Sequence, residues 1–158
     1  MKKFSHFPLT FSLILFASTI FSQEIEQSIY ITGNTWDISD TEVLSEISKK
    51  SQLVNKPTVL ILGNAAPKTE IEKSLDIQLS ILSNLGKDVI FIPGDKEWVN
   101  GYKGVFDIEK YIQKNSKAKF SPDDAEPIKH QDLGENVELI TVDSQWYLEN
   151  WDDHIYIN

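Results

Sequence analysis

The 158-residue chain contains no cysteine, and a count along the printed sequence finds no arginine either. Without cysteine it can form no disulfide, no thiolate metal site, no cysteine nucleophile and no acylated cysteine near residue 22. Without arginine it cannot clamp a phosphate group with a bidentate guanidinium. The stability of the folded chain must therefore come from packing.

Positive charge is scarce as well. All 15 cationic side chains are lysines, and they stand against 24 acidic residues, which gives a formal net charge of −9. The lysines form no cluster in the sequence, whereas binding to a phosphate backbone requires a cationic patch. We therefore expect no nucleic-acid partner and no attraction to anionic lipid headgroups.

The first 22 residues differ from the rest of the chain. Lys2 and Lys3 precede an apolar run over residues 9–21, and Ser22 follows it. A secretory signal peptide consists of a charged start, an apolar stretch and a small residue at the cleavage point. The apolar stretch here is too short for a comfortable membrane span. Removing two of the 15 lysines and none of the 24 acidic residues leaves a net charge of −11. We expect an exported protein of the periplasm or cell envelope, which meets the membrane only during export.

One pattern occurs three times in residues 23–158: an apolar, β-branched run ends in glycine and is followed by a polar residue. The runs cover residues 29–34, 59–64 and 89–95, and their glycines lie 30 and 31 positions apart. This spacing accommodates a strand, a loop, a helix and a return loop, which predicts an α/β domain with a parallel sheet. The polar residues would then share the carboxyl edge of the sheet, where α/β folds bind ligands.

Apolar residues at helical spacing lie between these runs. They predict helices over about 40–52, 71–85 and 105–112. Capping-box patterns at 39–42 and 69–72 precede the first two helices, and Gly86 stands at the expected C-cap of the second. Residues 115–126 predict a polar surface loop. Two further strands are expected at about 128–133 and 137–142.

The motifs at 33–34, 63–65 and 94–97 read Gly-Asn, Gly-Asn-Ala and Gly-Asp-Lys-Glu. In this order at strand ends they resemble the first three motifs of the calcineurin-like metallophosphoesterases, and residues 98–101 and 142–147 are similar to a bacterial envelope branch of that family. The resemblance implies a metallophosphoesterase-like sandwich of mixed β-sheet flanked by helices, of which residues 23–158 form the N-terminal half. It also implies a family activity that depends on a dinuclear metal site and hydrolyses phosphoesters.

The residues at the family's ligand positions depart from its pattern. Asn34 and Asn64 stand where the family has aspartate, and Asp95, Lys96 and Glu97 stand where it has Asn-His-Asp. A neutral amide cannot replace a carboxylate without losing most of the attraction for hard cations, and Lys96 adds a positive charge. We therefore expect no cofactor and a catalytically inactive domain with a binding or assembly role. The expected partner is an envelope protein or the C-terminal half of the fold.

A metal-dependent phosphoester hydrolase is the alternative hypothesis. Asp37, Asp95, Glu97 and Asp143 would then be relocated ligands of a divalent metal pair, and a longer natural chain would supply the histidines. Every candidate except Asp37 also has a structural explanation. Asparagine after glycine is a common turn former, residues 95–97 fit a solvated surface ion-pair group, and Asp143 fits a helix or turn cap.

Overall fold

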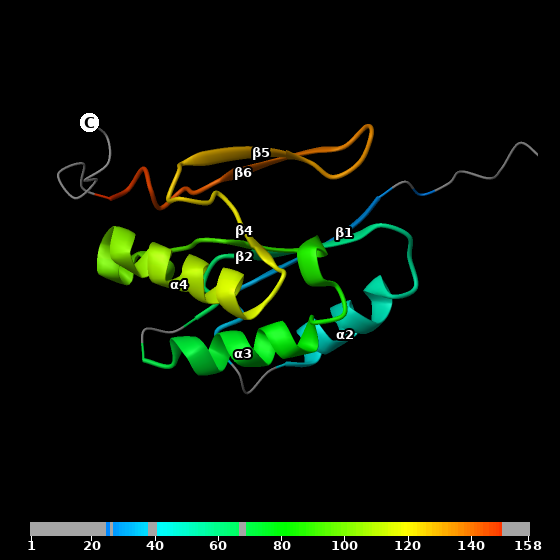
Figure 1. Cartoon of the computed structure of the whole chain (residues 1–158), viewed down its shortest axis with the longest axis horizontal. Helices are drawn as coiled ribbons and strands as arrows, with labels where there is room; N and C mark the ends of the chain where they lie inside the picture. Colours follow the sequence, from blue (N-terminus) through cyan, green and yellow to red (C-terminus); the bar gives the residue numbers. More distant parts are fainter. Residues whose placement is uncertain (1–24, 26, 38–40, 67–68, 150–158) are drawn as a thin grey trace, which may run out of the picture.

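The computed structural model describes residues 25, 27–37, 41–66 and 69–149. The expected signal peptide therefore lies outside the described residues. The described part is an α/β structure with a four-stranded sheet and a separate two-stranded sheet (Figure 1). None of its helices combines the length and the apolar character that crossing a bilayer requires.

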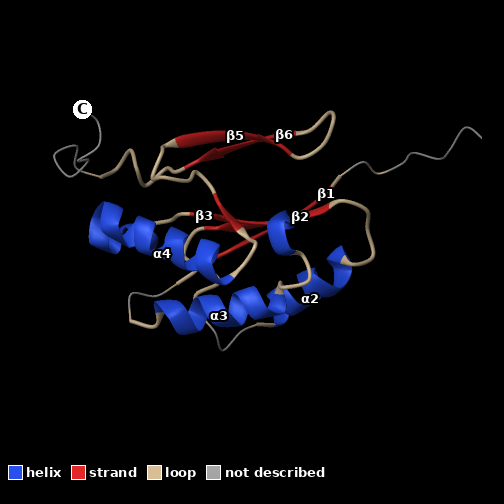
Figure 2. Cartoon of the chain, viewed as in Figure 1, coloured by secondary structure: helices blue, strands red, loops and turns tan. Residues whose placement is uncertain are grey.

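The larger sheet is parallel throughout. Its strands, in spatial order, are β1 (Ser28–Gly33), β2 (Pro57–Leu62), β3 (Val89–Ile92) and β4 (Lys119–Phe120). The main helices that connect them are α2 (Glu42–Ser51), α3 (Ile71–Ile81) and α4 (Gly101–Asn115). Crossovers between parallel strands are right-handed, and each one here moves one strand further in the same direction. All three helices therefore lie on one face of the sheet, as Figure 2 shows.

The main apolar core lies between the sheet and the helices. Val59, Ile61 and Phe91 alternate along their strands toward the helix layer and are at most 1% exposed. Leu75 of α3 and Val105 of α4 pack in the same core and are fully buried. Burying one such side chain favours folding by about 1.5–3 kcal/mol, so this layer is a major source of the domain's stability.

A hairpin covers part of the opposite face of the sheet (Figure 1). It consists of β5 (Ile128–Asp132) and β6 (Glu138–Val142), which pair antiparallel. Leu60 and Ile90 on that face are buried, whereas Ile29 and Ile31 of β1 are 42% and 60% exposed. The hairpin therefore leaves the β1 side of the sheet open.

The structure confirms the predicted α/β class, whereas the mixed sandwich that the resemblance implies stays a prediction. Within the described residues the larger sheet contains only parallel strands, the antiparallel pair is separate, and helices cover one face. The prediction of a polar surface loop at 115–126 is wrong in part. It contains β4, which pairs with β3 and buries Phe120. A strand of two residues is too short to show alternation in the sequence.

The helix ends depart from the capping patterns. Helix α2 follows Thr41 and α3 follows Glu70, and neither residue makes a side-chain capping hydrogen bond. Residues 39–40 of the first capping pattern lie outside the described part. Helix α3 ends at Ile81, and Gly86 begins the short 3₁₀ helix η1 (Gly86–Asp88) instead. The buried leucines 82 and 85 explain the longer prediction, because the apolar spacing continues after the backbone has left the helix.

Candidate functional site

The turns after β1, β2 and β3 meet at the carboxyl edge of the parallel sheet. Gly33 pairs with Leu62, and Leu62 pairs with Ile92, so the three turns begin side by side. The backbone N–H of Asn34 donates to the carbonyl of Gly63 at 3.0 Å. We call residues 34–36, 63–66 and 94–97 the strand-end crest. The predicted convergence of these residues at one edge is confirmed.

Two glycines touch at the centre of the crest. A Cβ added to Gly94 would lie 2.8 Å from the Cα of Gly63 and 2.9 Å from Oδ1 of Asn64. Gly63 also has a φ of 63°, and Asn34 and Asn64 have φ values of 57° and 55°. Glycine adopts this left-handed region freely, and asparagine is enriched there among the other residues. The turn geometry therefore explains the glycine–asparagine pairs before any chemistry is considered.

Glu97 is the buried member of the crest and is 2% exposed. Its Oε2 accepts the backbone N–H groups of Asn64 at 2.9 Å and Gly94 at 2.8 Å. Its Oε1 accepts those of Ala65 at 2.8 Å and Ala66 at 3.3 Å. A carboxylate offers about four lone-pair sites, and here backbone donors use all of them. Glu97 therefore ties the β2 turn to the β3 turn, and its interpretation as part of a solvated surface group is wrong.

Lys96 lies over the indole of Trp36, with Nζ 3.6 Å from the ring centroid. This distance is within the range of a cation–π interaction. Trp36 donates its Nε1–H to Oδ1 of Asn34 at 3.0 Å, and Oδ1 of Asn64 accepts the backbone N–H of Lys96 at 3.1 Å. The oxygen is the atom through which an amide binds a cation. In both asparagines it is already engaged within the crest.

Asp143 follows β6 and is fully buried. Its Oδ2 accepts the indole N–H of Trp98 at 2.7 Å, and its Oδ1 accepts the backbone N–H groups of Gln145 and Trp146 at 3.0 and 3.2 Å. Burial raises the pKa of Asp143, and these three hydrogen bonds oppose the rise. Asp143 thus caps the turn after β6 and links the hairpin to the 3₁₀ helix η2 (Glu97–Asn100).

Two of the four candidate metal ligands are already engaged by hydrogen bonds. Glu97 and Asp143 are buried and hydrogen-bonded through both carboxylate oxygens, whereas Asp37 and Asp95 are exposed. In the described ranges, no three His, Cys, Asp or Glu side chains gather in a way that could hold a metal ion. His130 lies on the hairpin, where Nδ1 is 2.9 Å from a glutamate oxygen of the neighbouring strand.

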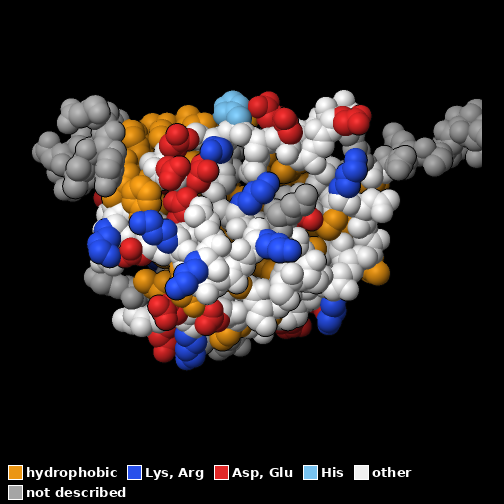
Figure 3. Space-filling model, viewed as in Figure 1, with side chains coloured by type: hydrophobic (Ala, Val, Ile, Leu, Met, Phe, Trp, Pro, Cys, Tyr) orange, Lys and Arg blue, Asp and Glu red, His pale blue; other side chains and the backbone are white. Residues whose placement is uncertain are grey.

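A cleft of about 560 Å³ opens beside the crest, between the sheet and β6. Leu60, Leu62 and Ile92 line it from the sheet, residues 139–142 line it from β6, and the turns at 63–64 and 93–95 border it from the crest. Figure 3 shows apolar side chains gathered on the hairpin side of the molecule. The candidate site therefore joins a polar crest to an apolar cleft.

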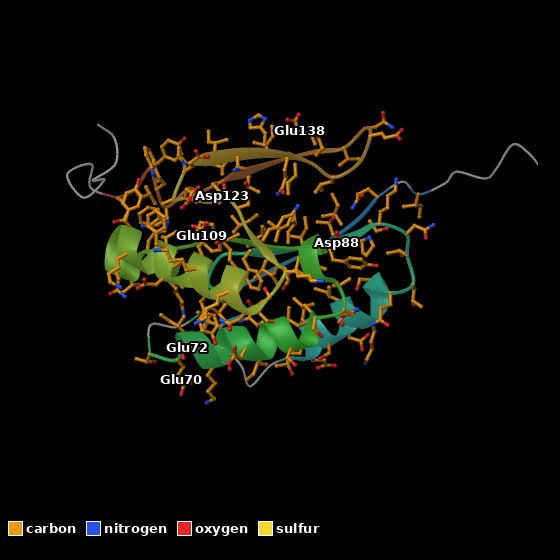
Figure 4. All side chains as sticks on the ribbon, viewed as in Figure 1. Glu70, Glu72, Asp88, Glu109, Asp123 and Glu138 are labelled. Carbon is orange, nitrogen blue, oxygen red and sulfur yellow. The ribbon has the colours of Figure 1, made fainter. Side chains whose placement is uncertain are left out.

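A buried acid that the sequence did not indicate lies on α4. Glu109 is 3% exposed, and its Oε2 accepts the backbone N–H of Asp124 at 3.1 Å. Burial raises the pKa of Glu109, and the carboxylates of Asp124 and Asp123 add to the rise (Figure 4). Asp123 in turn pairs with Lys129 of β5. This group fastens the loop after β4 to α4, and it lies outside the crest.

No family model, curated protein or solved structure matches this chain. The link to a family therefore depends on the motif resemblance, and the structure establishes an α/β architecture with a parallel sheet.

Proposed function

We propose that this chain is an exported, degenerate metallophosphoesterase-like domain that corresponds to the N-terminal half of that sandwich. It has no phosphoesterase activity and acts by binding another molecule in the periplasm or cell envelope. The order and spacing of the strand-end motifs support the proposal, as does the parallel sheet that brings their turns together. The apolar cleft beside the crest offers a place for a partner.

The observation that carries the proposal is the hydrogen bonding of Glu97. Four backbone N–H groups use the lone pairs with which this carboxylate would otherwise bind a cation. Asn34 and Asn64 contribute no charge, and Lys96 adds a positive one. Hard divalent cations depend on negative oxygen ligands for affinity. The crest therefore favours binding without metal chemistry.

The test is a calorimetric titration of chelator-treated protein with Mn²⁺, Fe²⁺ and Zn²⁺, together with an assay of aryl phosphate hydrolysis. We expect no binding at micromolar concentration and no turnover above a protein-free control. Two cations bound per chain at micromolar affinity, with hydrolysis that disappears in Asp95→Ala, would contradict the proposal. That result would support the alternative enzyme, with Asp37 and Asp95 as ligands.

A gain-of-charge variant sharpens the test. Asn34→Asp combined with Asn64→Asp puts two carboxylates on the crest without a change in side-chain size. We expect this variant to bind Mn²⁺ at least about tenfold more tightly than the parent, because each carboxylate adds an attractive charge. The matched control is Asn55→Asp with Asn136→Asp, which adds the same charge at exposed positions outside the crest. Equal Mn²⁺ affinity in both variants would show that the crest is not a latent metal-site scaffold.

A further inference from the structure

Within the described residues, the hairpin has a free edge. In the β5–β6 ladder, the N–H of Asp143 donates to the carbonyl of Pro127, and the N–H of Leu133 donates to the carbonyl of Val137, both at 2.9 Å. In an antiparallel ladder, hydrogen-bonded pairs alternate with non-hydrogen-bonded pairs. The hydrogen-bonded pairs between these two contacts are therefore 129–141 and 131–139. The intervening residues of β6 point their N–H and C=O groups away from β5. They are Glu138, Ile140 and Val142.

This free edge borders the cleft. Residues 139–142 line the cleft opposite Leu60 and Leu62, and none of its lining residues belongs to β5. Successive side chains of a strand point to opposite faces. A run of four consecutive lining residues therefore means that the edge of β6, and not one of its faces, meets the cleft.

The sheet surface beyond the free edge is apolar and open. Ile31 is 60% exposed and Leu62 is 47% exposed. In the sheet register Ile31 pairs with Leu60, which is buried under the hairpin. The exposed apolar surface at Ile31 and Leu62 is therefore continuous with the apolar surface at Leu60, which β6 covers. Contiguous exposed apolar side chains of this kind mark interaction sites.

The charge around the cleft restricts its occupant. Among the described residues, the lining contains no lysine and one acid, Asp95, at the crest end. The whole chain carries a formal net charge of −9. Like charges across an interface oppose binding, so an acidic segment is disfavoured. A neutral, apolar segment with a cationic residue beside Asp95 is favoured.

We propose that the cleft is the docking site for an extended strand of another protein. The strand pairs with the free edge of β6, places alternate apolar side chains against Leu62 and Ile31, and carries a lysine or arginine where it passes Asp95. Strand addition to an exposed edge is an established mode of peptide recognition. The inference rests on the proposed binding function and names the partner as a polypeptide strand.

The first experiment measures binding of the synthetic, fluorescein-labelled peptide Lys-Thr-Ile-Thr-Ile-Thr-Ile-Thr-Lys to the full chain by fluorescence anisotropy. We expect saturable binding of one peptide per chain. Two N-methylated forms of the peptide test strand pairing, one methylated at every isoleucine and the other at every internal threonine. Alternate residues of a strand turn their N–H groups to opposite edges. One form should therefore bind about tenfold or more weakly than the other.

Variants of the chain locate the site. Leu62→Lys places a charge on the floor of the cleft and should weaken binding by about tenfold or more. Leu53→Lys is the matched control, because Leu53 is 84% exposed and does not line the cleft. Ile140→Pro removes an N–H of the free edge that the β5 ladder does not use, and proline is tolerated at such edge positions. It should also weaken binding, with circular dichroism verifying the fold of each variant.

Several outcomes would overturn the inference. The first is equal affinity for the two N-methylated peptides. The second is self-association of the chain that is abolished by Leu62→Lys, because this would identify a second copy of the chain as the occupant. The third is peptide binding only in the full-length variant I155D/I157D, which would identify the chain's own last residues as the occupant. An absence of binding in both parent and variant also overturns it. Metal titration and phosphate hydrolysis are independent of these results, so the two proposals fail separately.

Discussion

Replacing Glu97 by glutamine tests whether its carboxylate holds the crest together. A glutamine oxygen has two lone pairs where the carboxylate offers about four sites, and the new NH₂ group would face backbone N–H donors. Two of the four backbone N–H groups that now bind Glu97 would lose their acceptor. An unsatisfied buried donor costs about 1–3 kcal/mol, and the two remaining bonds lose their charge assistance. We expect the free energy of unfolding to fall by about 3–5 kcal/mol.

Urea unfolding followed by tryptophan fluorescence measures this change. With a slope of about 1–3 kcal/mol per molar urea, the unfolding midpoint should fall by roughly 2 M. Asp95→Asn is the matched control, because it makes the same carboxylate-to-amide change two positions away on an exposed side chain. It should change the free energy of unfolding by no more than about 0.5 kcal/mol.

A Glu97→Gln variant within about 0.5 kcal/mol of the parent would refute the reasoning. Glu97 would then not be needed by the backbone of the two turns, and its oxygens would be free to act as ligands. The hydrogen bonding of Glu97 would then be no obstacle to a metal pair on the crest.

The remaining predictions concern two titrations and processing. Burial raises the pKa of Glu109 above its ordinary value of 4.5, so the folded chain binds this proton more tightly than the unfolded chain does. The difference in free energy of unfolding between the parent and Glu109→Gln should therefore fall as the pH rises from about 4.5 toward neutral. Urea unfolding midpoints at each pH measure this difference. The phenol of Tyr111 donates to Asp76 at 2.7 Å, which raises the pKa of Tyr111 to about 12, and Asp76→Asn should lower the pKa of the phenol in an ultraviolet absorbance titration. Secreted protein should begin within a few residues of Gln23 by intact-mass analysis, and a mature species that retains residues 4–16 would contradict export by signal cleavage.

The strands of the crest could be predicted because their signals are local. Apolar, β-branched residues and terminal glycines placed the runs at 29–34, 59–64 and 89–95, and β1, β2 and β3 overlap these runs. The spacing of the three glycines predicted that these strands are parallel. The short strand β4 could not be predicted in the same way, because its two residues are defined by pairing with β3 and not by a pattern of their own.

The role of Glu97 could not be predicted because its partners are distant in the sequence. Three of the four N–H groups that it accepts lie 31 to 33 positions earlier. In the sequence it stands beside Asp95 and Lys96 and completes a group that resembles a solvated surface turn. The adjacent Trp98, which is 3% exposed, is buried as well, but burial of one side chain does not predict burial of its neighbour.

The crest keeps its geometry without the carboxylates that a metal pair would need. Contact between Gly63 and Gly94 sets the approach of the two turns, and the bonds to Glu97 hold them there. Neither feature uses the charge of a side chain at position 34 or 64. Asparagine at those positions preserves the left-handed turns and still accepts hydrogen bonds within the crest. The fold, the crest and the cleft beside it therefore do not depend on carboxylates at positions 34 and 64.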